Sequence, residues 1–197
     1  MSQHAYKQPN KITEDDRVID INFSDLVRRT PLSYAAEGGN EVLVALILDC
    51  EEVNVDTADN HGVTPLAYAA GEDHECIVQL LLATGKADID PLNTETAPLV
   101  KAAFKGHEGV IRLLLATKKD DINRQESSER IVLMHAVDLG HEDVANLLLA
   151  TGKADPNTQD GFGESLLSQA AVHGYEGVVK SLLAMKDINV ELRDNGG

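Results

Sequence analysis

Apolar residues recur at helical spacing in five consecutive units of the chain. Each unit opens with a short triplet, and a run rich in leucine begins about 15 residues after the start of the triplet. The triplets start at residues 30, 64, 97, 131 and 165, which is a period of 34 residues with one interval of 33. A fixed period of this length predicts stacked helix pairs, because one pair cannot bury its own apolar stripe without a neighbour. The triplets are Thr30-Pro31-Leu32, Thr64-Pro65-Leu66, Ala97-Pro98-Leu99, Ile131-Val132-Leu133 and Ser165-Leu166-Leu167.

A pair of small residues and then a turn separate the two apolar stretches of every unit. Small side chains let neighbouring helices approach closely, and glycine permits the left-handed conformation that ends a helix. Thr before Pro suits a helix start, because the hydroxyl can cap and Pro is tolerated at the first helical position. The small pairs are Ala35-Ala36, Ala69-Ala70, Ala102-Ala103, Ala136-Val137 and Ala170-Ala171. The turns are Gly39-Asn40, Asp73-His74, Gly106-His107, Gly140-His141 and Gly174-Tyr175.

Residues 30–197 resemble the ankyrin repeat family, because all these landmarks recur together in register. The resemblance implies an all-α solenoid of five complete repeats, each a β-turn finger plus two antiparallel helices. It also implies a protein-binding scaffold rather than an enzyme, and the Leu-Leu-Ala-Thr-Gly-Lys-Ala-Asp style is similar to that of fungal repeat arrays. We expect residues 1–29 to form a polar segment and a partial finger. The expected repeats are 30–63, 64–96, 97–130, 131–164 and 165–197.

Both ends of the chain fall in the middle of the repeat pattern. Asp20-Ile21-Asn22 has the form of a finger without helices before it, and residues 190–197 align with residues 55–62. The chain is therefore expected to be a fragment of a longer array or a short protein whose last surface a partner covers. An uncovered final helix pair would favour weak end-to-end self-association, whereas a polar outer face would keep the chain monomeric.

The chain is strongly acidic, with a formal net charge of −16 at pH 7. This charge argues against nucleic-acid binding and against anionic membranes, since both need basic patches. It would speed encounter with a basic protein partner, or it is only a solvated surface. No apolar stretch reaches the length of a membrane span, and Cys50 and Cys76 lack metal-ligand spacing. We expect reduced thiols and a cytoplasmic location, with the nucleus as the alternative.

No motif for catalysis, metals or cofactors is complete. His107-Glu108 and His141-Glu142 begin like the zinc motif HExxH, but Ile111 and Ala145 stand where its second histidine is required. We therefore expect these histidines to be structural and the chain to have no cofactor and no catalytic residues. The segment 161–167 likewise fails both the dinucleotide and the serine-hydrolase patterns.

The resemblance implies that a partner binds the concave face, formed by the fingers and the exposed side of the first helices. Several of the corresponding residues are apolar, which is the composition expected of a binding surface. The expected contacts on the fingers are Leu26, Val27, Arg29, Asn60, His61, Val63 and Phe162, with Thr94, Thr96, Ser127, Ser128, Arg130 and Glu164 as further finger positions. On the first helices they are Phe104, Lys105, Leu139, Val172 and His173, with Glu37, Glu72 and Asp138 nearby.

One position of the first helices is polar where the family usually has an apolar residue. Buried polar groups need partners, so these residues should bond to one another, face a ligand, or extend to the rim. The position holds Tyr34, Tyr68, Lys101, His135 and Gln169. The alternative function is a small-molecule-binding or catalytic protein with a groove lined by Tyr34, Tyr68, Lys101 and His135. Lys101 or His135 would then be the acid–base group, and a deep closed pocket would favour this alternative.

Overall fold

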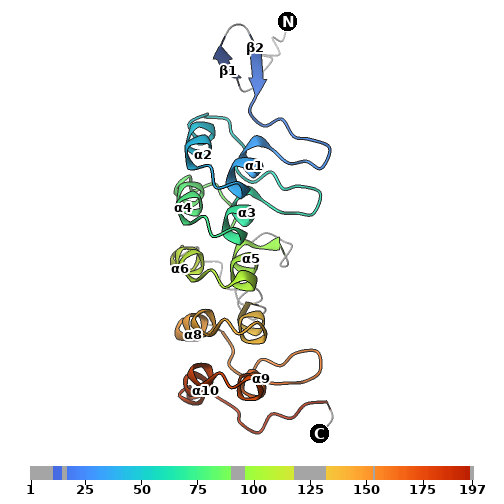
Figure 1. Ribbon diagram of the computed structural model, residues 1–197, viewed down its shortest axis with the longest axis vertical. Helices are drawn as coiled ribbons and strands as arrows, with labels where there is room; N and C mark the ends of the chain where they lie inside the picture. The colour runs from blue at the N-terminus through green and yellow to red at the C-terminus, as the bar shows by residue number, and fades with distance from the viewer. Residues whose placement is uncertain (1–10, 15–16, 90–95, 118–131, 153, 196–197) are drawn as a thin grey trace, which may run out of the picture.

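The computed structural model describes residues 11–14, 17–89, 96–117, 132–152 and 154–195. Its helices form two columns, inner and outer, stacked along one axis (Figure 1). The inner column consists of α1 (Pro31–Glu37), α3 (Pro65–Gly71), α5 (Pro98–Lys105), the helical residues 132–138 and α9 (Leu166–His173). The outer column consists of α2 (Glu41–Leu48), α4 (Glu75–Ala83), α6 (Glu108–Ala116), α8 (Glu142–Ala150) and α10 (Glu176–Leu183).

These helices make five antiparallel pairs, as the period predicts. Loops project from the inner column, and we call the described ones fingers 20–29, 54–63, 155–164 and 189–195 (Figure 1). The prediction of an all-α solenoid is confirmed. The structure adds a feature that the period could not predict, an antiparallel pair formed by β1 (Lys11–Glu14) and β2 (Arg17–Asp20) before the first finger.

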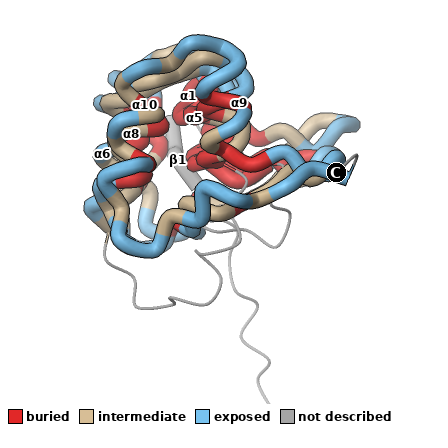
Figure 2. The backbone as a smooth tube through the Cα atoms, turned by 90° about the horizontal axis from the view of Figure 1, so that it is seen from below, coloured by how far each residue is buried: buried red, intermediate tan, exposed pale blue. Residues whose placement is uncertain are grey.

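The core runs continuously between the two columns of helices. Figure 2 shows buried backbone gathered between the helix layers, with exposed backbone around it. Outer helices contribute large buried side chains such as Leu81 and Leu148, while inner helices contribute the small pairs, which are buried except for Ala171. The small residues allow close packing of successive inner helices, so the stack has one core rather than five separate ones.

Side-chain caps begin some inner helices but not all. The hydroxyl oxygens of Thr30, Thr64 and Ser165 each accept a hydrogen bond from the backbone N–H three residues later, at 3.2 Å. Ala97 occupies the corresponding position before α5 and offers no cap. Such a cap contributes about 1 kcal/mol to stability, so α5 starts less favourably than α1 and α3.

The Gly-His turns join successive repeats. The Nε2 atom of His74 lies 3.0 Å from the carbonyl oxygen of Glu37, at the end of the preceding inner helix. Gly39 has a φ of 71°, and a Cβ there would lie 2.7 Å from the His74 ring. His107 and His141 make the same contact with Gly71 and Phe104, at 3.2 Å. The structural role expected for His107 and His141 is thereby confirmed.

Candidate functional site

An aspartate closes each described finger that precedes an inner helix. In finger 20–29, one carboxylate oxygen of Asp25 accepts hydrogen bonds from the backbone N–H groups of Val27 and Arg29, at 3.0 and 2.8 Å. Asp59 and Asp160 repeat this arrangement in fingers 54–63 and 155–164. The finger backbone is therefore fixed by its own side chain, and the second carboxylate oxygen remains available.

That second oxygen binds the polar residue of the inner helix. The hydroxyl of Tyr34 donates to Asp25 at 2.7 Å, and the hydroxyl of Tyr68 donates to Asp59 at 2.6 Å. The amide of Gln169 donates to Asp160 at 3.2 Å. At these three positions, the polar residues neither bond to one another nor remain free for a ligand. They tie each inner helix to its own finger, nine residues earlier.

The two bonds between a tyrosine and an aspartate perturb the titration of both partners. Hydrogen bonds from Tyr34 and from the backbone of Arg29 hold the pKa of Asp25 below its ordinary value. Burial alone would raise the pKa of Asp59, but the bonds from Tyr68 and the finger backbone outweigh it and lower that pKa. Burial, followed by the bond to Asp59, raises the pKa of Tyr68 to about 12.

The side chain of Arg29 lies between two tyrosine rings, so it does not extend freely from its finger. Its guanidinium carbon lies 4.0 Å from the ring centre of Tyr34 and 4.3 Å from that of Tyr68. The same group forms an ion pair with Glu37 at 2.5 Å, and the arginine side chain is only 15% exposed. The expectation of a finger side chain available to a partner therefore does not fit Arg29, which joins the first two repeats.

The next two polar positions differ from the tyrosines. Lys101 is half-buried, and it forms no hydrogen bond or ion pair with any residue in the described part of the chain. His135 is also half-buried, and its ring meets Phe104 edge-on, with 6.1 Å between ring centres. Among the described residues, neither side chain bonds to a carboxylate, and the fingers before these two helices lie outside the described residues.

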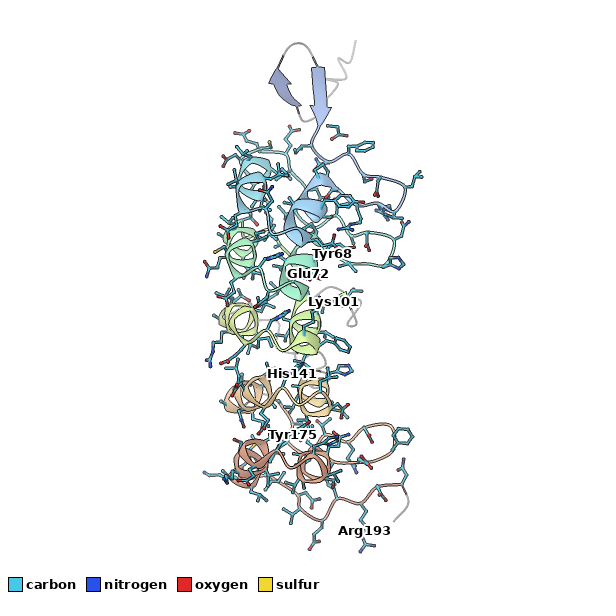
Figure 3. All side chains as sticks on the ribbon, viewed as in Figure 1. Tyr68, Glu72, Lys101, His141, Tyr175 and Arg193 are labelled. Carbon is cyan, nitrogen blue, oxygen red and sulfur yellow. The ribbon has the colours of Figure 1, made fainter. Side chains whose placement is uncertain are left out.

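A groove of about 480 Å³ lies between finger 54–63 and the inner helices α3 and α5. Figure 3 labels three of its lining residues, Tyr68, Glu72 and Lys101, on these neighbouring helices. Lys105 also lines the groove and forms an ion pair with Glu72 at 2.8 Å. Neither Tyr34 nor His135 lines it. The four residues proposed for a small-molecule site are therefore not gathered in this groove, which is open to solvent.

The apolar side chains expected on this face are exposed, but they form separate groups. Leu26 and Val27 lie on finger 20–29 and Phe162 on finger 155–164, at opposite ends of the stack. The other group follows the ends of three successive inner helices and comprises Phe104, Leu139 and Val172, which are 57%, 44% and 84% exposed. The second group has one exposed apolar side chain in each of three successive repeats, and the fingertip residues do not join it.

Other predicted contacts have internal roles. The backbone N–H and side-chain amide of Asn60 donate to carbonyl oxygens of the preceding finger, at Val27 (3.0 Å) and Leu26 (3.3 Å). Val63 is only 8% exposed. His173 stacks on Tyr175, with 5.4 Å between ring centres. The predicted positions Thr94, Ser127, Ser128 and Arg130 lie outside the described residues. His61 is exposed, as expected for a fingertip.

The sequence interpretation missed the finger aspartates. Asp25, Asp59 and Asp160 each stand five residues before the capping Thr or Ser and nine before the polar helix position. A fixed offset of this kind was available as a signal. It was missed because an acidic residue in a loop is usually only solvated.

Within the described residues, no group of three or more His, Cys, Asp or Glu side chains is placed to hold a metal ion. None of the described helices has the length and apolar character needed to cross a membrane.

A family model described as ankyrin repeats (3 copies) matches residues 16–93 and again residues 99–194. No match was found among curated proteins. The two matched ranges cover most of the chain and span the five helix pairs described above. The chain belongs to the ankyrin repeat family.

Proposed function

We propose that this chain is a scaffold that binds a protein partner on its finger face, which we define as the fingers and the exposed side of the inner helices. Ankyrin repeats are generally protein–protein interaction modules. The observation that carries the proposal is the set of exposed apolar side chains Phe104, Leu139 and Val172 at or just after the ends of three successive inner helices. Exposed apolar patches of this kind favour interaction sites.

The rigidity of the finger face supports the same function. Each described finger before an inner helix is closed by an aspartate, and that aspartate is bonded in turn to the helix. Asn60 and Asn195 then link fingers to their predecessors. Ordering a loop during association costs free energy, so fingers that are already fixed bind a partner at lower cost.

The small-molecule or catalytic alternative has less support. Its four residues do not line one pocket, since Tyr34 is bonded to Asp25 and His135 lies beside Phe104, both outside the groove. Ligand sites generally enclose most of the ligand's surface, whereas this groove is open. An extended segment of a protein suits an open groove better than a small molecule does.

The net charge suggests the overall charge of the partner. Every outer helix begins with an acidic residue, from Glu41 in α2 to Glu176 in α10, and the whole chain carries −16. A partner with net positive charge would be steered toward this field, and salt would slow the encounter. We therefore propose a basic protein as the partner.

The test is capture of partners from source-cell extract, followed by measurement of their affinity for purified variants. The triple substitution Phe104→Ala, Leu139→Ala and Val172→Ala should weaken binding by about tenfold or more, because buried apolar anchors dominate interface energies. The matched control is Val42→Ala with Leu46→Ala, since both residues are exposed on outer helix α2. A partner whose affinity responds only to the control substitutions would contradict the proposal.

A further inference from the structure

We infer that the last helix pair binds a helix pair of a partner protein, which places a histidine ring on Gly174 and donates a hydrogen bond to the carbonyl oxygen of Val172. Figure 1 shows α9 and α10 as the last helices of the two columns. We call this surface the end face and define it by Ala171, Val172, Gly174 and Leu183. The inference goes beyond the proposed function, because it assigns a second docking surface outside the fingers.

A ring from the following helix pair closes each joint inside the stack. The Nε2 atoms of His74, His107 and His141 lie 3.0, 3.2 and 3.2 Å from a carbonyl oxygen at the end of the preceding inner helix. A carbonyl oxygen only accepts, so Nε2 is the donor in each bond. These histidines stand directly before α4, α6 and α8, and Tyr175 holds the same position before α10. The chain therefore joins its helix pairs by one repeated contact.

A glycine in the turn makes room for the ring. A Cβ added at Gly39, Gly106 or Gly140 would lie 2.7 Å from an atom of the aromatic side chain that precedes the next outer helix. Gly174 is the equivalent residue of the last repeat, and its φ of 78° resembles the 71°, 77° and 76° of the other three. Yet among the described residues, no atom lies within 4 Å of its Cβ position. The place for a ring is thus present in the last repeat and is open.

The hydrogen-bond acceptor of this joint is open as well. Val172 corresponds to Glu37, Gly71 and Phe104, whose carbonyl oxygens bond to the three histidines. Within the described part of the chain, the carbonyl oxygen of Val172 accepts no such bond from a ring. A histidine of the partner would therefore find both the space and the acceptor that the internal histidines use.

The helices around Gly174 lack the cover that the earlier repeats have. The second residue of the small pair is at most 1% exposed in the first four repeats, whereas its equivalent Ala171 is exposed. Leu183 is 53% exposed, while the equivalent leucines of the four earlier outer helices are buried or half-buried. In those repeats the next helix pair covers both positions. A helix pair on the end face would bury the same kind of apolar surface, which favours association.

The finger of a following repeat is already in place beside the end face. Asn195 donates from its backbone N–H and its side-chain amide to carbonyl oxygens of finger 155–164, at 2.9 and 3.4 Å, as Asn60 does toward finger 20–29. The occupant therefore needs helices but no finger. A second copy stacked head to tail fits less well, because its finger 20–29 would need the place of finger 189–195. Its first outer helix also follows Asn40 rather than a histidine.

The test is selection from a displayed library of helix–turn–helix peptides in which the residue before the second helix is randomised, with the full chain as bait. Parallel selections use Gly174→Ala, whose methyl group would occupy the place of the ring. The control is Gly152→Ala, which has similar left-handed strain at a φ of 69° and an equally open Cβ position. We expect histidine to be enriched on the unmodified chain and on Gly152→Ala, but not on Gly174→Ala.

Affinities of individual selected peptides locate the contact. They should fall about tenfold with Gly174→Ala, because the added methyl group overpacks the joint. Replacement of the peptide's histidine by alanine should cost about fivefold, as expected for one hydrogen bond. Leu183→Glu should also weaken binding, whereas the same change at Leu43, which is exposed on the first outer helix, should have no effect. Phe104→Ala on the finger face should likewise leave these affinities unchanged.

Three results would overturn the inference. Peptides that respond to Leu183→Glu but show no preference for histidine would remove the role of Gly174. Peptides that respond to Phe104→Ala and not to Leu183→Glu would favour the finger face alone, so the proposed function would stand without the inference. Self-association in sedimentation that Leu183→Glu abolishes would identify a second copy as the occupant of the end face.

Discussion

The first two repeats and the third repeat have different residues, with different bonds, at the same two positions of the inner helix. In the first two, a threonine caps each inner helix, and a tyrosine joins that helix to its finger. Arg29 then joins the two repeats by lying between both tyrosine rings. In the third, Ala97 replaces the capping threonine, and Lys101 replaces the tyrosine without a partner in the described structure.

Under the proposed function, this difference separates repeat positions that stabilise the fold from repeat positions that bind a partner. The early repeats use their polar side chains for internal bonds, which leaves few polar groups available for a partner. The third repeat gives up a cap, its Lys101 has no bond among the described residues, and its Phe104 is exposed. Functional surfaces commonly carry such local losses, which the rest of a fold offsets.

The largest expected effect tests the joints that both regions share. Gly106→Ala should reduce the free energy of unfolding by about 3 kcal/mol, since it adds left-handed strain to overpacking. Its Cβ would lie 2.7 Å from the ring of His141, at a φ of 77°. Gly152→Ala is the control, because its φ is 69° but nothing lies within 4 Å, so only about 1 kcal/mol should be lost. Urea denaturation measures both values.

Gly39→Ala extends this test to the first repeat, where the Cβ would meet His74 at 2.7 Å. Equal losses for Gly39→Ala and Gly106→Ala would show that the two regions differ in caps and finger bonds rather than in their joints. A loss for Gly106→Ala no larger than that for Gly152→Ala would contradict the role of the histidine ring.

The next effect concerns the caps. Thr64→Ala should lower the stability of the chain by about 1 kcal/mol, and Ala97→Ser should raise it by up to about the same amount. Repeats 3 and 4 should accordingly exchange backbone hydrogens faster than repeat 1, since local stability follows the local bonds. Hydrogen exchange followed by mass spectrometry reports this order directly. If repeats 3 and 4 prove to be the best protected part of the chain, this prediction is wrong.

A pH-dependent effect sharpens the contrast further. The pKa of Tyr68 is raised from 10.0 to about 12 in the folded chain. Stability from this group is therefore complete below pH 10 and is lost as the pH rises toward 12, by no more than about 1 kcal/mol after solvent screening. Tyr68→Phe should remove this part of the alkaline loss in denaturation midpoints measured across that range. An alkaline profile identical to that of the unmodified chain would show that Tyr68 contributes nothing there.

The aspartates act at the other end of the pH range. The folded pKa values of Asp25 and Asp59 lie below their ordinary value of 3.8, so their contribution is present above that pH and is lost as the pH falls below it. Asp59→Asn should flatten the acid side of the same profile. Gln169, which also bonds to an aspartate, does not titrate, so its bond should add nothing to the alkaline loss.

The smallest expected effect is a gain. Asp73 has a φ of 61°, where the corresponding turns of repeats 1 and 3 have Gly39 and Gly106. Asp73→Gly should stabilise the chain by about 0.5 kcal/mol, because relief of left-handed strain exceeds the loss of chain entropy. The gain is reduced by loss of the contact with His107, at 3.6 Å. A lower unfolding midpoint in urea would show that this contact outweighs the strain.

The sequence predicted the repeated architecture because its signals are local and recur. Thr-Pro at residues 30–31 and Gly106 each act through their own backbone, so their register alone predicts helix starts and turns. The bond from Tyr34 to Asp25 was also within reach, as a fixed offset of nine residues. It was missed because neither residue type alone requires that bond.

Other features depend on contacts between repeats and could not be read from a single unit. Arg29 was expected to face a partner, yet the second repeat places the ring of Tyr68 against it. Asn60 was expected to be a contact residue, yet the preceding finger lies within reach of its amide. The β1–β2 pair lies before the repeats, where no period was available to predict it.

The recurring histidine joint also bears on how such a chain can change length. His74, His107 and His141 each bond to a carbonyl at the end of the preceding inner helix, and neither the donor nor the acceptor depends on the identity of the inner side chains. A duplicated unit inserted at one of these joints would find the same acceptor before it and supply the same acceptor after it. The gene can therefore gain or lose a whole repeat without a matching change in its neighbours, and the finger face lengthens or shortens in steps of one repeat.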